Sequence, residues 1–134
     1  MAVFVKFNSF VEALAEKQHN LGSDVIEVAL TNTLPTAANT QLSDITQITY
    51  TNCSARVVTI TSSAQTGGTY ALVGTDLVLT ASGGTVGPFA HVVLFNQTST
   101  GDLLIGFWSY GSSITLNDGE TFTVDFGASI LTLA

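Results

Sequence analysis

The stretches LLIGFWSY at residues 103–110 and AHVVLFNQ at residues 90–97 decide the fold, because each is apolar at consecutive positions. Successive side chains of a strand point to opposite faces of its sheet. Val92 and Leu94 would therefore lie on one face, and the apolar residues between and after them on the other. Strands that are apolar on both faces are covered on both faces. We therefore expect these two strands inside a layered β protein.

The segments around this pair alternate between apolar and polar residues, as strands with one buried face do. Two turn motifs, TGGT at 66–69 and NDGE at 117–120, are typical of hairpins. Further short strands are predicted near residues 26–31, 48–50, 58–60, 70–72, 77–81, 114–116, 122–126 and 130–133. About eight or nine short strands predict a mainly β fold, an antiparallel β-sandwich of jelly-roll or immunoglobulin-like type.

One helix is predicted near the N-terminus, at about residues 9–18. Ser9 and Glu12 have the spacing of a capping box, which satisfies free N–H groups at a helix start. One apolar stripe at helical spacing consists of Phe7, Phe10, Val11 and Leu14. We expect this stripe to dock on an edge or a face of the sandwich.

The composition predicts one domain spanning residues 1–134. Hydrophobic residues make up 46% of the chain and charged residues 10%, which excludes a disordered protein. Three Lys and Arg against ten acids give a net charge of -7, so we expect neither a nucleic-acid partner nor a membrane partner. The N-terminal segment lacks the pattern of a signal peptide, and Cys53 is the one cysteine. Both features favour synthesis in a reducing cytoplasm.

The residues offer little for catalysis, and we expect no enzyme activity, no cofactor and no metal. The chain has two histidines, His19 and His91, which we expect to be solvated and part of a strand, respectively. A Ser-His-Asp arrangement stays open, since triad members meet in space and not in sequence. The acids are scattered without the spacing of a calcium loop, although a loop calcium site stays open as well. Cys53 has an uncharged polar context, so we expect an inert, partly buried thiol.

A candidate interface follows from the two strands that are apolar on both faces. One sandwich core buries one face of each strand, and one short helix covers only part of the other. Two sets of residues could form the second face, since a one-residue shift in register exchanges them. One set contains Val93, Phe95, Leu104, Trp108 and Tyr110, and the other contains Val92, Leu94, Leu103, Ile105 and Phe107. The candidate interface residues are Phe95, Leu104, Trp108 and Tyr110, from the set that contains Trp108. An uncovered apolar patch of this size usually marks a contact surface. We therefore predict self-association, as a trimer or dimer, or docking on a partner through this set.

Trp108 and Tyr110 allow a second interpretation, because they lie two residues apart on a predicted strand and point the same way. Such a pair suits a stacking platform for a sugar ring. The alternative is that this face packs against the helix or a second subunit.

Several stretches of the chain resemble small structural proteins of tailed bacteriophages. They are LVLTASGGTVGPF at 77–89, LIGFWSYGSSITL at 104–116, GETFTVDF at 119–126, FNSFVE at 7–12 and DITQI at 44–48. These are strand and turn motifs, so the resemblance transfers neither a catalytic residue nor a capsid contact.

The resemblance implies a capsid decoration, or cement, protein on the virion surface. Its partner would be the outer face of the major capsid protein, and its role would be to stabilise the head. The alternative is a tail- or fibre-associated module that binds a host glycan through Trp108 and Tyr110. A small β-sandwich enzyme ranks behind both.

Overall fold

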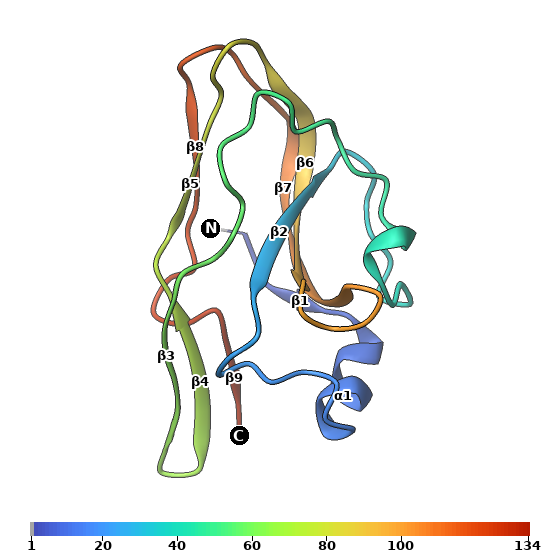
Figure 1. The fold of residues 1–134 in the computed structure, drawn as a ribbon, viewed down its shortest axis with the longest axis vertical. Helices are drawn as coiled ribbons and strands as arrows, with labels where there is room; N and C mark the ends of the chain where they lie inside the picture. Colours follow the sequence, from blue (N-terminus) through green and yellow to red (C-terminus); the bar gives the residue numbers. More distant parts are fainter. Residues whose placement is uncertain (1) are drawn as a thin grey trace.

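The computed structural model describes residues 2–134 and is mainly β, with one short helix (Figure 1). Within these residues the chain forms nine strands, one α-helix and one 3₁₀ turn. In chain order they are β1 (Val5–Lys6), α1 (Asn8–Ala15), β2 (Ile26–Thr31), the 3₁₀ turn (Leu42–Asp44), β3 (Ile60–Thr66), β4 (Thr69–Gly74), β5 (Leu77–Thr80), β6 (Val86–Asn96), β7 (Leu103–Leu116), β8 (Thr121–Val124) and β9 (Leu131–Leu133).

The strands form two layers, and every strand pair is antiparallel. One layer is the four-stranded sheet β1-β7-β6-β2. The other layer holds the sheet β3-β4-β9 and, beyond it, the pair β5-β8 (Figure 1). The prediction of an antiparallel β-sandwich with one N-terminal helix is therefore confirmed.

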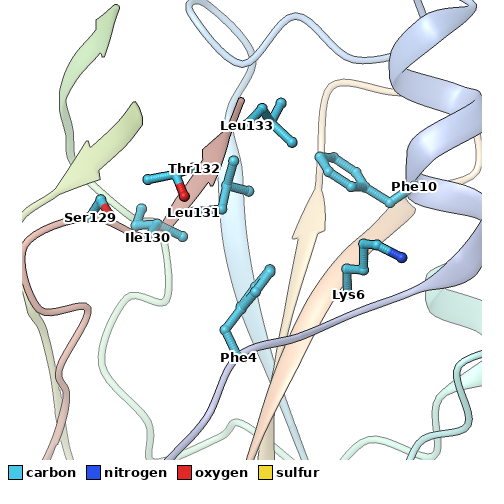
Figure 2. A pocket seen from close by; sticks show the side chains of 8 residues that line it. All are labelled: Phe4, Lys6, Phe10, Ser129, Ile130, Leu131, Thr132 and Leu133. Carbon is cyan, nitrogen blue, oxygen red and sulfur yellow. The ribbon is translucent and has the colours of Figure 1, made fainter. Parts of the chain in front are cut away.

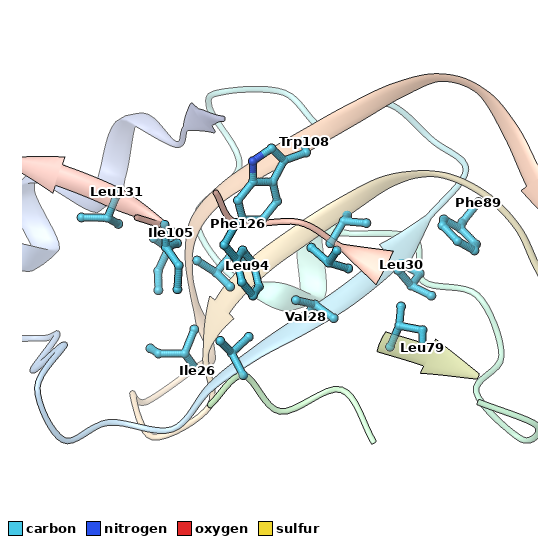
Figure 3. Close-up of a cluster of buried hydrophobic side chains, with 14 of the residues drawn as sticks. Ile26, Val28, Leu30, Leu79, Phe89, Leu94, Ile105, Trp108, Phe126 and Leu131 are labelled. Atoms are coloured by element: carbon cyan, nitrogen blue, oxygen red, sulfur yellow. The ribbon is translucent and has the colours of Figure 1, made fainter. Parts of the chain in front are cut away.

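The main core lies between the two layers (Figure 3). Val28 from β2 and Leu94 from β6 face Leu79 from β5 and Leu131 from β9. Burial of such a side chain stabilises a fold by about 1.5–3 kcal/mol, so this cluster is the main source of stability. In β2 the core residues Ile26, Val28 and Leu30 stand at alternating positions, as the sequence pattern predicts.

A second, smaller cluster lies on the outer face of the four-stranded sheet. Its buried residues are Phe7, Ala29, Ile45, Val93, Phe95, Leu104 and Phe107. The loop that follows β2 and contains the 3₁₀ turn lies over this face (Figure 1) and contributes Ile45. Both faces of β6 and β7 are thus covered within one chain, as strands apolar on both faces require.

The helix begins one residue earlier than predicted and ends at Ala15. The predicted capping box is wrong, because Phe7 is the N-cap and no side chain bonds the helix start. Val11 is 52% exposed, so the predicted stripe is also partly wrong. Ala13 is buried in its place, so Phe10 and Ala13 form the buried face of the helix.

Two strand predictions also need correction. The segment 48–50 is not a strand, although Ile48 donates a backbone hydrogen bond to Leu30 on the edge of β2 that does not pair with β6. The NDGE turn at 117–120 does not close a hairpin, since β7 pairs with β6 whereas β8 pairs with β5. The turn instead carries the chain from one layer to the other. The TGGT hairpin at 66–69 is confirmed.

Candidate functional site

The four predicted interface residues do not form one exposed face. Phe95, Leu104 and Trp108 are only 2%, 1% and 5% exposed, and Tyr110 is half-buried. Phe95 and Leu104 belong to the outer cluster, whereas Trp108 and Tyr110 pack with the main core. The predicted exposed patch is therefore wrong for these residues in the isolated chain.

A bulge in β7 explains why strict alternation fails. Leu94 pairs with Gly106 and Phe95 with Leu104, which leaves Ile105 as an extra residue. One extra residue in a strand shifts every later side chain to the opposite face. Leu104 therefore faces outward while Trp108 faces the core.

Trp108 cannot serve as a stacking platform for a sugar, because its ring is covered by other rings. Phe4 and Phe126 lie 5.2 and 5.6 Å from it, centroid to centroid. Tyr110 meets the ring of Phe122 edge-on at 5.1 Å. Burial, with a smaller contribution from Asp125, raises the pKa of Tyr110 to about 12.

The prediction that His19 is solvated is wrong, because the residue is buried, with 5% of its surface exposed. Its Nδ1 lies 2.9 Å from the amide nitrogen of Asn96, which also donates to Asp24 Oδ2 at 2.7 Å. The amide oxygen of Asn96 accepts from two backbone N–H groups, at Thr98 and Ser99, so the amide orientation is determined. Asn96 therefore donates to His19 Nδ1, and the ring proton lies on Nε2.

Nε2 of His19 is buried without a hydrogen-bond partner among the described residues. Burial lowers the pKa of His19, and the nearby Asp24 carboxylate raises it by a smaller amount. A neutral ring accepting from Asn96 agrees with this direction. These bonds join the segment that contains His19 and Asp24 to Asn96 at the end of β6.

His91 lies across from Ser109 on the β6-β7 pair, with Nδ1 2.9 Å from the serine oxygen. Burial lowers the pKa of His91. The carboxylate needed to orient this ring in a Ser-His-Asp arrangement is not among its hydrogen-bond partners within residues 2–134. The same part of the chain contains no cluster of three or more His, Cys, Asp or Glu placed to hold a metal.

The contacts of Arg56 and Cys53 indicate structural roles for both residues. The Arg56 guanidinium pairs with Glu27 at 3.3 Å, donates to the carbonyl of Val28 at 2.6 Å and stacks on the Tyr50 ring at 3.7 Å. These contacts attach the 48–58 segment to the edge of β2. Cys53 is partly buried as predicted, and burial raises the pKa of its thiol, which disfavours the reactive thiolate.

Sequence reasoning missed an open groove beside β9, and Figure 2 shows the side chains that line its first part. Its first part, a cavity of about 430 Å³, lies between β9 and the β1–α1 corner, with Phe4, Lys6 and Phe10 on one wall and residues 129–133 on the other. Its second part, about 350 Å³, is lined by residues that include Lys17, His19, Ser63 and Tyr70. Leu133 lines both parts, so we treat them as one groove, the β9 groove.

The β3–β4 hairpin extends beyond the core at one end of the sandwich (Figure 1). Every residue from 61 to 69 is exposed, so β3 is bare on both faces over most of its length. Residues 57–75 carry no charged side chain. We refer to residues 60–74 as the arm.

Comparisons with protein-family models, with curated proteins and with solved structures found no match. The resemblance to phage structural proteins therefore remains a prediction. Within the described residues, no helix is long and apolar enough to cross a bilayer.

Proposed function

We propose that this chain is a structural protein of a tailed-phage virion: a decoration or cement protein that binds the outer face of the major capsid protein and stabilises the head. The sequence resemblance suggests the class, and the arm is the structural observation that supports it best. The exposed part of the arm, residues 61–69, consists of serine, threonine, alanine, glutamine and glycine and carries no charge, in a chain of net charge -7.

Such a surface suits close packing against neighbouring protein. Burying a charge costs several kcal/mol unless it is paired, whereas a neutral polar strand brings no ions to desolvate. The free edge of β3 also presents backbone N–H and C=O groups that a neighbour could bond. A protein that binds the assembled shell but not its separate subunits stabilises the shell by mass action.

The test begins with particles of the phage that encodes this chain. Quantitative mass spectrometry of purified virions should find the chain in a copy number comparable with the major capsid protein. A copy number of a few per particle would instead indicate a tail module, and absence from virions would overturn the proposal. Particles lacking the chain should lose their DNA at a lower temperature, and adding the purified chain should restore the original temperature.

The arm itself is tested by a charge variant. Ser62→Glu with Ala64→Glu places two charges on one exposed face of β3, and occupancy on purified heads should fall by about tenfold or more. Thr121→Glu with Thr123→Glu is the matched control, since both residues are exposed at the same spacing on β8. Equal occupancy for the two variants would exclude the arm as the contact surface.

A further inference from the structure

The β9 groove borders a strand edge whose hydrogen-bonding groups can be assigned from the sheet register. Thr66 and Thr69 flank a two-residue turn with positive φ at both glycines, so they form a hydrogen-bonded pair. Hydrogen-bonded and non-bonded pairs alternate along an antiparallel ladder. Ala64 and Ala71 are therefore also a bonded pair, and the backbone groups of Ala71 point to β3.

The same alternation directs the backbone of Thr132 away from β4. Thr132 lies opposite Ala71, whose N–H and C=O are already used on β3. The bond from Ile130 N–H to Leu72 C=O, at 2.7 Å, fits this assignment, since Leu72 then points to β9. Thr132 thus presents its N–H and C=O at the free edge of β9, where it also lines the groove.

The charged side chains that line the groove are both cations, and the acid Asp24 lies beside it, where its carboxylate accepts from the backbone N–H of Asn20 at 2.7 Å. Of the three cations in the chain, Arg56 is paired with Glu27. The other two, Lys6 and Lys17, each line one part of the groove, and neither forms an ion pair with a described residue. None of the ten acids lines either part. The groove is therefore a cationic site on an acidic protein, with apolar walls formed by Phe4, Phe10, Ile130, Leu131 and Leu133.

We infer that the β9 groove is a strand-acceptor site for an extended, acidic segment of a partner protein. The segment pairs with the free edge of β9 through Thr132. Its side chains alternate, so that apolar residues enter between Phe10 and Leu133 while carboxylates on the other face meet Lys6 and Lys17. Recognition of this kind takes its affinity from main-chain hydrogen bonds and its specificity from alternate side chains.

A second copy of this chain is a poor occupant. The segment at 120–125 combines Glu120 and Asp125 with Phe122 and Val124, but its apolar face alternates with threonine and not with acids, and residues 121–124 form β8, which is paired with β5. The N-terminal strand β1, which pairs with β7, carries Lys6 and no acid. The partner is therefore a different protein, and the inference does not depend on whether that protein is a capsid subunit.

Three synthetic peptides test the chemistry by fluorescence anisotropy with the full chain. The first alternates valine and glutamate, the second alternates valine and lysine, and the third is the first with N-methyl groups on the backbone nitrogens that would face β9. We expect the acidic peptide to bind at least about tenfold more tightly than either of the others. Equal binding of the acidic and basic peptides, or no binding of the acidic peptide, would overturn the inference.

Variants then locate the site. Lys6→Gln with Lys17→Gln should weaken binding of the acidic peptide by about tenfold. The control, Gln97→Glu with Thr123→Glu, changes the net charge equally at exposed positions outside the groove lining and should change binding less than about twofold, since salt screens distant charges. Thr132→Pro removes the outward N–H without breaking a bond to β4, and it should abolish binding while the unfolding midpoint stays near that of the parent.

Equal loss of binding in the two charge variants would overturn the site, as would unchanged binding in Thr132→Pro. Sedimentation of the chain alone tests whether a second copy occupies the groove. Self-association that Thr132→Pro abolishes would assign the groove to a second copy and overturn the inference. Presence or absence of the chain in virions is a separate result, so failure of this inference is distinguishable from failure of the proposed function.

Discussion

The side-chain amide of Asn96 donates a hydrogen bond to Nδ1 of His19 across a distance of 2.9 Å, in the interior of the protein. The two residues are 77 positions apart in the chain, so the contact ties the segment after α1 to the end of β6. Protonation of Nδ1 would place two donors against each other. The contact therefore requires a neutral histidine.

The free energy of unfolding should fall with pH below neutrality. Burial places the pKa of folded His19 below 6.5, the value that applies to the unfolded chain. The unfolded chain therefore binds more protons between these two values, and stability is complete above about pH 6.5 and falls as the pH drops toward the folded pKa. One such group contributes a slope of at most about 1.4 kcal/mol per pH unit. Urea unfolding from neutral pH to about pH 5.5 measures it.

His19→Gln keeps an acceptor for Asn96 and should flatten this slope. His91→Gln is the comparison variant. Burial also lowers the pKa of His91, so this residue contributes to the pH slope with the same sign, and the variant separates its share from that of His19. An unchanged slope in His19→Gln would contradict the assignment of His19 as the pH-sensitive group.

Phe10→Ala should destabilise the fold by about 3–5 kcal/mol, because Phe10 is 3% exposed and its removal leaves a cavity between α1 and the core. Val11→Ala is the neighbouring control, since Val11 is 52% exposed and its loss should cost less than about 0.5 kcal/mol. Chemical unfolding measures both. Similar losses in the two variants would mean that α1 packs through a different face.

Gly106→Ala should cost about 1–3 kcal/mol through overpacking. A Cβ at this position would collide with the Phe4 ring and lie 2.9 Å from the carbonyl oxygen of Val5. Adding Phe4→Ala removes the ring, so the cost of the alanine at position 106 should be smaller in that background. A double-mutant cycle measures this coupling, and strict additivity would contradict it.

Trp108→Ala should lower the free energy of unfolding by about 3–5 kcal/mol, since the indole is 5% exposed between Phe4 and Phe126. This differs from the sequence-based expectation that Trp108 anchors an interface. Partner binding, measured at a temperature where the variant is still folded, should be nearly unchanged. Lost binding with an unchanged unfolding midpoint would restore the interface assignment.

Treatment with a chelator should leave the unfolding midpoint unchanged, since no described cluster of His, Cys, Asp or Glu is placed to hold an ion. Differential scanning calorimetry with and without EDTA measures this. A lower midpoint that calcium restores would reveal a loop calcium site.

Local patterns in the sequence were enough to predict the β-sandwich, the TGGT hairpin and the single helix. These features depend on local pattern: side chains alternate with period two in a strand, and two glycines supply the positive φ that the hairpin turn needs. The double coverage of β6 and β7 also followed from their composition, because apolar side chains on both faces must leave water.

The faces of the individual residues were decided only by the tertiary structure. The bulge at Ile105 moves Trp108 to the opposite face from Leu104, and no residue pattern announces one extra residue in a ladder. The cover over the outer face comes from the loop around Ile45, which has no strong periodicity of its own. The His19–Asn96 contact and the β9 groove likewise join distant segments. The sequence determined which residues must be buried, and only long-range packing decided what covers them, because a local pattern carries no information about which distant segment meets it.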